Sequence, residues 1–209
     1  MTEPLQGRPT VVFDLGGVLV DWDPRYLYRK LIPEEDVDEF LAEIGFTEWN
    51  HAQDSGGPWD EAVASLATAY PHRRELIAAY PARFLETLGG PIHDVVTILD
   101  ELAERGTRLL ALTNWSAQTF ATARAVLTFL DRFEGVVVSG EEGLAKPDPR
   151  LFERLAGRYS LLPSHTVYVD DAAANVAAAS ALGFDAVHFR GATRLRADLA
   201  GRGLLPPVD

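Results

Sequence analysis

Short apolar runs alternate along most of the chain with longer amphipathic stretches. The run Val11-Val12-Phe13 leads directly into Asp14, and a continuous apolar run of this kind is typical of a strand buried on both faces. The same pattern predicts further strands at residues 108–113, 135–139, 166–169 and 186–189. The stretches between these runs have helical periodicity, which favours right-handed βαβ units and a parallel sheet.

The segment from residue 23 to about residue 90 interrupts this alternation. It contains no convincing strand, and Asp23-Pro24 is a typical helix start. Helices are predicted at residues 25–31, 34–44, 59–70 and 73–88, the last divided in two by Pro81. We therefore expect an α/β fold with a Rossmann-like parallel sheet core formed by residues 1–20 and 91–209. Residues 21–90 are expected to form a small helical cap inserted into it.

Composition narrows the classes of function. A length of 209 residues suits one domain, or one domain with a modest insertion. The net charge of -12 argues against a nucleic-acid or anionic-membrane partner. The absence of Cys excludes disulfides and thiolate metal sites. The first ten residues have no signal-peptide pattern and no apolar run is long enough to span a membrane, so we expect a cytoplasmic protein, as a monomer or a homodimer.

Chemically capable side chains stand where the predicted strands end. Such ends meet at one edge of a parallel sheet, and here they carry Asp14, Thr113, Asn114, Lys146, Asp170 and Asp171. Three neighbouring carboxylates repel one another unless a cation lies among them, and oxygen ligands suit Mg²⁺. Asp14 could then act as a nucleophile. The hydroxyl, amide and ammonium groups would hold the oxygens of a phosphoryl group during its transfer.

Each of these residues also has an ordinary structural explanation. Thr113-Asn114 alone is more often a loop start or helix cap, and a lysine such as Lys146 before a proline is usually a solvated surface residue. Asp170-Asp171 alone is equally typical of a helix N-terminus. Their joint placement at successive strand ends favours the functional interpretation.

Four motifs in the same order resemble those of the haloacid dehalogenase-like hydrolases, which are mostly phosphatases. The resemblance covers almost the whole chain. The motifs are residues 13–19 (FDLGGVL), 112–114 (LTN), 143–149 (GLAKPDP) and 168–175, which begin with YVDD and end with Asn175. Each motif alone is a weak signal, and the ordered set is a strong one. The most similar subgroup includes bacterial sugar-phosphate phosphatases and the phosphatase domain of soluble epoxide hydrolases.

The resemblance implies a role for each motif. Asp14 would be both the nucleophile and a Mg²⁺ ligand, and the Thr113 hydroxyl would bind the phosphoryl group together with Asn114. Lys146 would stabilise the nucleophile and the phosphoryl charge. The acids of the fourth motif would complete the metal site. Two glycines that follow Asp14 would act through their backbone. The carbonyl of Gly16 would bind the metal, and the backbone of Gly17 would bind the phosphate.

One position departs from the family pattern. Phosphatases of the family usually carry a second Asp two residues after the nucleophile, which protonates the leaving group and later activates water. Here that position is Gly16, which has no side chain. Loss of a positioned acid typically costs about a hundredfold to ten-thousandfold in rate, although a leaving group of low pKa suffers less. Asp21 or Asp23 could substitute, but a helix cap and a surface charge are their commoner roles.

Three functions follow as hypotheses. The first is a Mg²⁺-dependent phosphatase that acts on a small, sugar phosphate-like ester through an aspartyl-phosphate at Asp14. The second is a metal-free 2-haloacid dehalogenase-type hydrolase, which is compatible with Gly16. That relative usually replaces the acids of the fourth motif with Ser and Asn, because without a metal they would put uncompensated charge beside the nucleophile. The third is a catalytically weak binding protein that keeps the pocket, and Gly16 favours it.

Substrate choice is expected to lie with the cap. Candidates to reach over the pocket are Trp49, Asn50, His51, Trp59 and Arg83. The alternative is that the tryptophans pack in the core of the cap and the others lie on its surface. Trp115, just after the second motif, either lines the pocket or packs beneath it.

Overall fold

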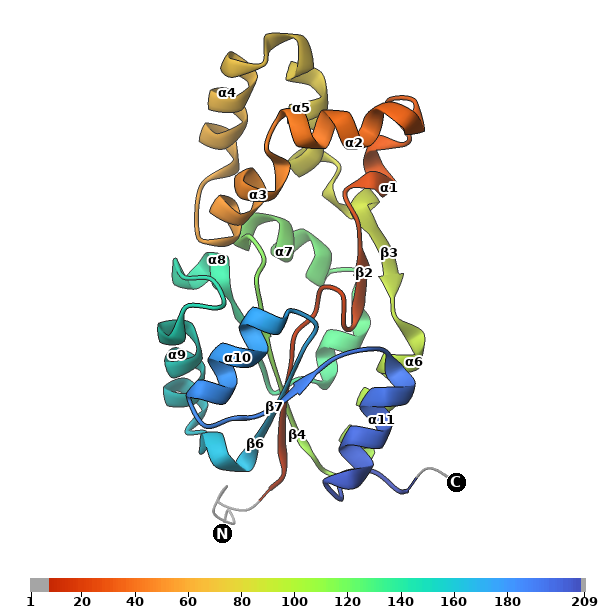
Figure 1. Ribbon diagram of the computed structural model, residues 1–209, viewed down its shortest axis with the longest axis vertical. Coiled ribbons are helices and arrows are strands. Elements are labelled where there is room, and N and C mark those ends of the chain that lie inside the picture. The colour runs from red at the N-terminus through yellow and green to blue at the C-terminus, as the bar shows by residue number, and fades with distance from the viewer. Residues whose placement is uncertain (1–7, 208–209) are drawn as a thin grey trace.

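A computed structural model describes residues 8–207 and has a five-stranded parallel sheet at its centre (Figure 1). The strand order is β5-β4-β1-β6-β7. The strands are β1 (Thr10–Phe13), β4 (Arg108–Thr113), β5 (Gly135–Val138), β6 (Thr166–Asp170) and β7 (Asp185–His188). Because β1 pairs with β4 on one side and with β6 on the other, the topological switch point lies at the carboxyl end of β1. This is where ligands bind in open α/β sheets.

Helices cover both faces of the sheet. Val11 and Phe13 of β1 belong to one apolar cluster, whereas Val12 between them belongs to a second cluster. This alternation is expected of a strand buried on both faces. The first cluster is covered by α6 (His93–Glu104) and α11 (Ala192–Gly201), and the second by α9 (Pro149–Tyr159) with α10 (Ala173–Ala181) alongside it. Two shorter helices follow the ends of β4 and β5, α7 (Ala117–Arg124) and α8 (Ser139–Glu142). The predicted α/β fold is confirmed.

Five helices stand together beyond the carboxyl ends of the strands, at the top of Figure 1. They are α1 (Arg25–Tyr28), α2 (Glu34–Glu43), α3 (Phe46–Asp54), α4 (Trp59–Ala69) and α5 (Arg74–Ala82). Edge-to-face and tilted aromatic contacts join their inner faces, with Tyr80 in contact with Phe46, Trp49 and Trp59. We call residues 21–90 the cap segment, and its boundaries remain a prediction.

A two-stranded antiparallel sheet connects the core to the cap segment. It pairs β2 (Val20–Trp22) with β3 (Leu88–Pro91), so the prediction that residues 23–90 contain no strand is wrong at its end. The sequence Leu88-Gly89-Gly90-Pro91 has low β-propensity. The partner strand β2 lies at the other end of the cap segment, so no local sequence pattern predicts β3.

The helices of the cap segment differ in two places from those predicted. Helix α3 was not among them, because it follows α2 directly and carries few apolar residues. Pro81 lies inside the last turn of α5 rather than between two helices. Short 3₁₀ helices lie between the other elements at Pro71–Arg73, Phe84–Thr87, Thr128–Arg132 and Pro163–His165. Within residues 8–207, none of the helices has both the length and the apolar character that crossing a bilayer requires.

Candidate active site

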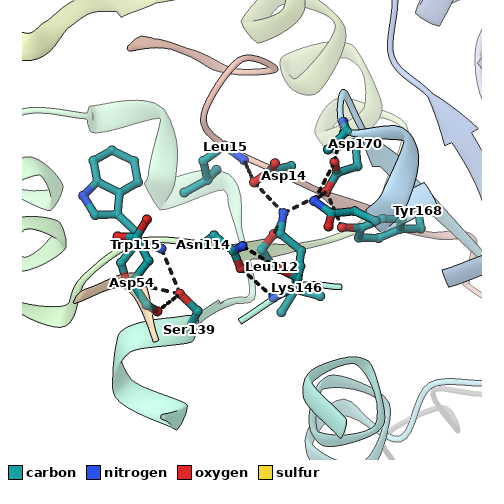
Figure 2. Close-up of polar contacts among 12 residues, drawn as sticks. Asp14, Leu15, Asp54, Leu112, Asn114, Trp115, Ser139, Lys146, Tyr168 and Asp170 are labelled. Atoms are coloured by element: carbon teal, nitrogen blue, oxygen red, sulfur yellow. Dashed lines mark hydrogen bonds and ion pairs between the residues drawn. The ribbon is translucent and has the colours of Figure 1, made fainter. Parts of the chain in front are cut away.

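The carboxyl ends of three adjacent strands bring the predicted site residues together. Asp14 follows β1, Thr113 ends β4 and Asp170 ends β6. The peptide N–H of Asp14 donates to the Val169 carbonyl at 2.8 Å, which fixes the end of β1 against β6. Figure 2 shows Asp14 between Asp170 on one side and the loop that follows β4 on the other. The predicted convergence of these strand ends is therefore observed.

Lys146 lies beneath this cluster with its side chain fully buried. Its Nζ is 2.8 Å from Asp14 Oδ1 and 2.8 Å from Asp170 Oδ2, and it donates to the Leu112 carbonyl at 3.0 Å. These contacts engage all three N–H groups of an ammonium. The structural alternative of a solvated surface lysine is therefore wrong, because the lysine joins two carboxylates and the end of β4.

Asn114 holds the main chain of Lys146 in place. Its Nδ2 donates to the Lys146 carbonyl at 2.9 Å, and its Oδ1 accepts from the Lys146 peptide N–H at 2.8 Å (Figure 2). This reciprocal pair fixes the third motif against the second. Thr113 is almost fully buried and is not among the residues that line the cavity described below.

Asp170 is enclosed by hydrogen-bond donors. Besides Lys146, its carboxylate accepts from the Tyr168 hydroxyl, from the Ala172 peptide N–H at 2.8 Å and from Asn175 Nδ2 at 3.0 Å. These donors occupy most of the lone pairs that a carboxylate offers. Asp171 is exposed and lines the cavity described below.

Burial and neighbouring charges have different net effects on the pKa values of the three acids. Burial raises the pKa of Asp14 to about 7 against the opposing charge of Lys146, and the charge of Asp170 adds to the rise. Burial also opposes ionisation of Asp170, but the Lys146 ammonium outweighs it and lowers the pKa of Asp170. The pKa of Asp171 is raised, first by the partial desolvation of its carboxyl group, although the residue as a whole is exposed, and then by the charge of Asp170. The single lysine thus leaves the site with an excess of negative charge.

The donor set of this cluster fits a hard divalent cation. Asp14, Asp170 and Asp171 each offer a carboxylate oxygen, and these oxygens lie within 4.8 Å of one another. Oxygen-only sites with room for water suit Mg²⁺. A divalent cation would also offset the charge that Lys146 leaves uncompensated.

The two glycines in the segment after Asp14, Gly16 and Gly17, have different surroundings. Gly17 has φ +72°, and a Cβ there would lie 2.3 Å from Asp171 Oδ2, so the fold requires a residue without a side chain. Apart from its two chain neighbours, no residue of the described chain has an atom within 4 Å of where a Cβ at Gly16 would lie. The missing acid has therefore left open space rather than a position filled by a neighbour.

A cavity of about 430 Å³ opens above Asp14. Its core side is lined by Asp14, Gly16, Gly17, Asn114, Trp115 and Asp171, and its cap side by Trp22, Asn50, Asp54, Tyr80 and Phe84. Asn50 and Trp115 thus lie where the pocket hypothesis placed them. The other candidates do not line this cavity. Trp49 and Trp59 pack in the aromatic cluster, His51 is exposed and Arg83 pairs with Glu86.

The substitutes considered for the missing acid also lie elsewhere. Asp21 accepts a hydrogen bond from Tyr26, and Asp23 caps the start of α1 by accepting from the Arg25 peptide N–H at 2.9 Å. Neither lines the cavity.

Sequence reasoning missed four lining residues of the cap side, namely Trp22, Asp54, Tyr80 and Phe84. Asp54 ends the helix that was not predicted, and its place in the cavity depends on how the cap segment meets the core. The one local signal was the spacing of Asn50 and Asp54, which puts both side chains on the same face of a helix.

Comparison with known proteins places these observations in a family. A profile of the haloacid dehalogenase-like hydrolases matches residues 9–183. The sesquiterpene phosphatase astK of Aspergillus oryzae is 28% identical over 179 residues, 85% of this chain and 87% of the relative. The fructose-1-phosphate phosphatase YqaB of Escherichia coli is 29% identical over 192 residues, 86% of this chain and 95% of the relative.

Solved structures share the fold. The HAD family enzyme bt-2542 of Bacteroides thetaiotaomicron has a TM-score of 0.71 at 20% identity, covering 88% of this chain and 95% of that one. The L-2-haloacid dehalogenase of Xanthobacter autotrophicus has a TM-score of 0.62 at 19% identity, covering 95% and 85%. At these identities the likeness concerns the fold alone. Since the family profile spans most of its length, the chain belongs to the haloacid dehalogenase-like hydrolases.

Proposed function

We propose that this hydrolase is a Mg²⁺-dependent phosphatase that acts on a small phosphate ester through an aspartyl-phosphate at Asp14. The observation that carries the proposal is the buried Lys146 between two carboxylates, with a third carboxylate, Asp171, at the same cavity. A carboxylate nucleophile held beside a cation site suits attack on phosphorus. The phosphatases among its relatives support the same reaction.

We assign the direct metal ligands to Asp14, Asp171 and the carbonyl of Gly16. All three residues line the cavity, whereas the oxygens of Asp170 are already engaged by hydrogen-bond donors. Asp170 would then act through its charge and by holding Lys146. When bound, Mg²⁺ would neutralise the charge that develops on the phosphoryl oxygens.

Lys146 would act chiefly on the nucleophile. Because its N–H groups already bind Asp14, Asp170 and the Leu112 carbonyl, it favours the ionised form of Asp14 and fixes its orientation. The Thr113 hydroxyl and the backbone at Gly17 would bind phosphoryl oxygens. Asn114 was predicted to bind the same group, and its contacts favour a role in positioning Lys146.

The cavity suits a small leaving group with both an apolar and a polar side. Its volume of about 430 Å³ lies within the range of small-molecule sites. Tyr80, Phe84 and Trp115 supply aromatic walls, and Asn50 and Asp54 supply polar groups on the cap side. A sugar phosphate-like ester fits this mixture and remains the proposed substrate class.

Hydrolysis of p-nitrophenyl phosphate with and without Mg²⁺ tests the proposal. We expect turnover that requires Mg²⁺ and disappears in Asp14→Asn, while the exposed Asp94→Asn on α6 retains wild-type activity. Turnover that survives in Asp14→Asn would refute the assigned nucleophile.

The dehalogenase alternative keeps one observation in its favour, namely Gly16 in place of the usual acid. It predicts halide release from 2-haloacids that is insensitive to EDTA. The clustered Asp170 and Asp171 weigh against it, because a metal-free site would leave their charge uncompensated. Retained Mg²⁺ binding without turnover of either substrate class would instead support the binding-protein hypothesis.

A further inference from the structure

The position that usually carries the leaving-group acid is empty in this chain. Gly16 has no side chain, and apart from its two chain neighbours no residue of the described range 8–207 has an atom within 4 Å of where its Cβ would be. An alkyl phosphate still needs a proton for its leaving oxygen, because an alkoxide is a poor leaving group in water. A phosphatase with this site therefore needs a proton donor from another part of the molecule.

The cavity contains one carboxyl group that the proposed reaction has not used. Its lining acids are Asp14, Asp54 and Asp171, and the first and last of these serve as nucleophile and metal ligand. Asp54 is the last residue of α3 and lies on the cap side. In the view of Figure 2, Asp54 and Asp170 lie on either side of Asp14.

Hydrogen bonds fix the carboxyl group of Asp54 from within the cap segment. Asn50 Nδ2 donates to Asp54 Oδ2 at 2.9 Å, and the Tyr80 hydroxyl donates to Asn50 Oδ1 at 3.0 Å. The chain Tyr80–Asn50–Asp54 therefore fixes the orientation of this carboxyl group at the cavity.

A contact from the core fixes the main chain of the same residue. The Ser139 hydroxyl donates to the Asp54 carbonyl, and it accepts from the Trp115 peptide N–H at 2.9 Å (Figure 2). The main chain of Asp54 is therefore held against the core at Ser139, the first residue of α8. Its location depends on the cap segment being seated on the core.

The surroundings of Asp54 favour a carboxyl group that can exchange a proton near neutral pH. Burial raises its pKa to about 7, while hydrogen bonds from the Ser116 backbone and Asn50 lower it. The titratable groups at this cavity are Tyr80 from α5, Asp14 after β1 and Asp171 after β6. Burial keeps the pKa of Tyr80 well above its usual value, so Tyr80 stays neutral.

We propose that Asp54, at the cap side of the cavity, is the general acid and base of the proposed phosphatase in place of the residue missing at position 16. This role rests on the proposed phosphatase function. As an Asp14 oxygen bonds to phosphorus, the phosphorus–oxygen bond to the leaving group breaks and the leaving oxygen takes the proton of the Asp54 carboxyl group. Water then attacks the phosphorus of the aspartyl-phosphate and gives a proton to Asp54. The products are the alcohol and inorganic phosphate, with Asp14 again ionised and Asp54 again protonated.

The test compares Asp54→Asn with wild type on two leaving groups. For glycerol phosphate, whose alkoxide needs protonation, we expect kcat/KM to fall by about a hundredfold or more. For p-nitrophenyl phosphate, whose phenolate leaves without a proton, we expect a fall below about tenfold. The exposed Glu48→Gln on the same helix is the matched control and should change neither value. Equal losses on both substrates, or a change in KM alone, would overturn the proposal.

A second variant separates proton transfer from a structural defect. Gly16→Asp in the Asp54→Asn background puts a carboxyl group into the open space beside Asp14. We expect it to recover at least tenfold in turnover of glycerol phosphate, because a carboxyl group on another element would not repair a packing defect in α3. Failure to recover, with both variants folded by circular dichroism, would assign Asp54 a structural role and overturn the proposal.

The pH profile gives a further readout. For wild type, kcat on glycerol phosphate should fall as pH rises above about 7, and Asp54→Asn should lack this descending limb. A wild-type protein that hydrolyses neither ester with Mg²⁺ would refute the phosphatase function and this role with it. A wild type that hydrolyses both esters, with the descending limb intact in Asp54→Asn, would overturn the role of Asp54 alone.

Discussion

A buried cation between two carboxylates is the residue-scale feature on which the site depends. Lys146 contacts Asp14 and Asp170 with its side chain fully buried. The desolvation cost of such charges is offset only while both signs are present. The lysine therefore contributes to the stability of the core and favours the ionised form of Asp14.

Replacing Lys146 by Met should destabilise the protein strongly. The change leaves Asp14 and Asp170 buried without a counter-ion, and breaking a buried pair in this way typically costs about 3–5 kcal/mol. Urea unfolding at neutral pH in EDTA measures the loss, with the surface Lys30→Met as the control. A difference below about 1 kcal/mol would contradict the observed ion-pair geometry.

Asp54 should make stability depend on pH in a predictable direction. Its pKa is raised from 3.8 to about 7 in the folded protein. The contribution of Asp54 to the stability of the folded protein is therefore fully present below about pH 3.8 and is lost as pH rises through 7. The free energy of unfolding of Asp54→Asn, relative to that of wild type, should therefore increase by about 2–3 kcal/mol as pH rises from 5 to 8. Urea unfolding without metal measures this change. A constant difference would show that Asp54 is not buried as described.

At the scale of elements, the cap segment is attached to the core by a small number of hydrogen bonds beside the cavity. Trp59 Nε1 donates to Ser116 Oγ at 2.7 Å, and the Trp59 peptide N–H donates to Gln118 Oε1 at 3.1 Å. The Ser139 contact with Asp54 lies in the same region. These contacts set the position of α3 and α4 above Asp14.

Trp59→Phe should loosen this attachment and leave the fold intact. The indole N–H is lost and Ser116 loses a buried partner, which typically costs about 1–3 kcal/mol. Hydrogen exchange of the amides in α3 and α4 should accelerate. Trp49→Phe is the matched control, because its indole bonds to Ala62 within the cap segment. Equal acceleration in both variants would rule out a specific contact between cap and core.

The sequence predicted best where structure is local. Buried runs such as Val11-Val12-Phe13 end in polar residues, and the parallel sheet brings those ends together, so the convergence of Asp14, Lys146 and Asp170 could be predicted. The pairing of β2 with β3 could not be predicted, because it joins opposite ends of the cap segment. Asp54 was missed for the same reason, since its role depends on the docking of one part of the chain on another.

For the whole molecule, the net charge of -12 makes cation binding a central question. The carboxylates at the sheet edge leave the site with excess negative charge, which attracts a divalent ion. Each ligand must be ionised to bind, so metal affinity is linked to the raised pKa of Asp14. Binding and stability should therefore change together with pH.

Mg²⁺ should stabilise the folded protein, and more so at pH 8 than at pH 6. The folded-state pKa of Asp14 is about 7, so a bound cation must displace its proton at the lower pH. At a hundred times the dissociation constant the gain is about 2.7 kcal/mol, which differential scanning calorimetry detects. Asp171→Asn should lose this gain, whereas the remote Asp185→Asn should keep it. An unchanged melting temperature in wild type would refute the metal site.

The most direct measurement is the detection of a phosphoryl group on Asp14 during turnover. The protein would be mixed with Mg²⁺ and a phosphate ester, quenched in acid within the first turnover and digested for mass spectrometry. We predict a phosphoryl group on the peptide that carries Asp14, and none when Asp14→Asn is treated in the same way. Turnover with that peptide unmodified at every time point would contradict the nucleophile on which the account depends.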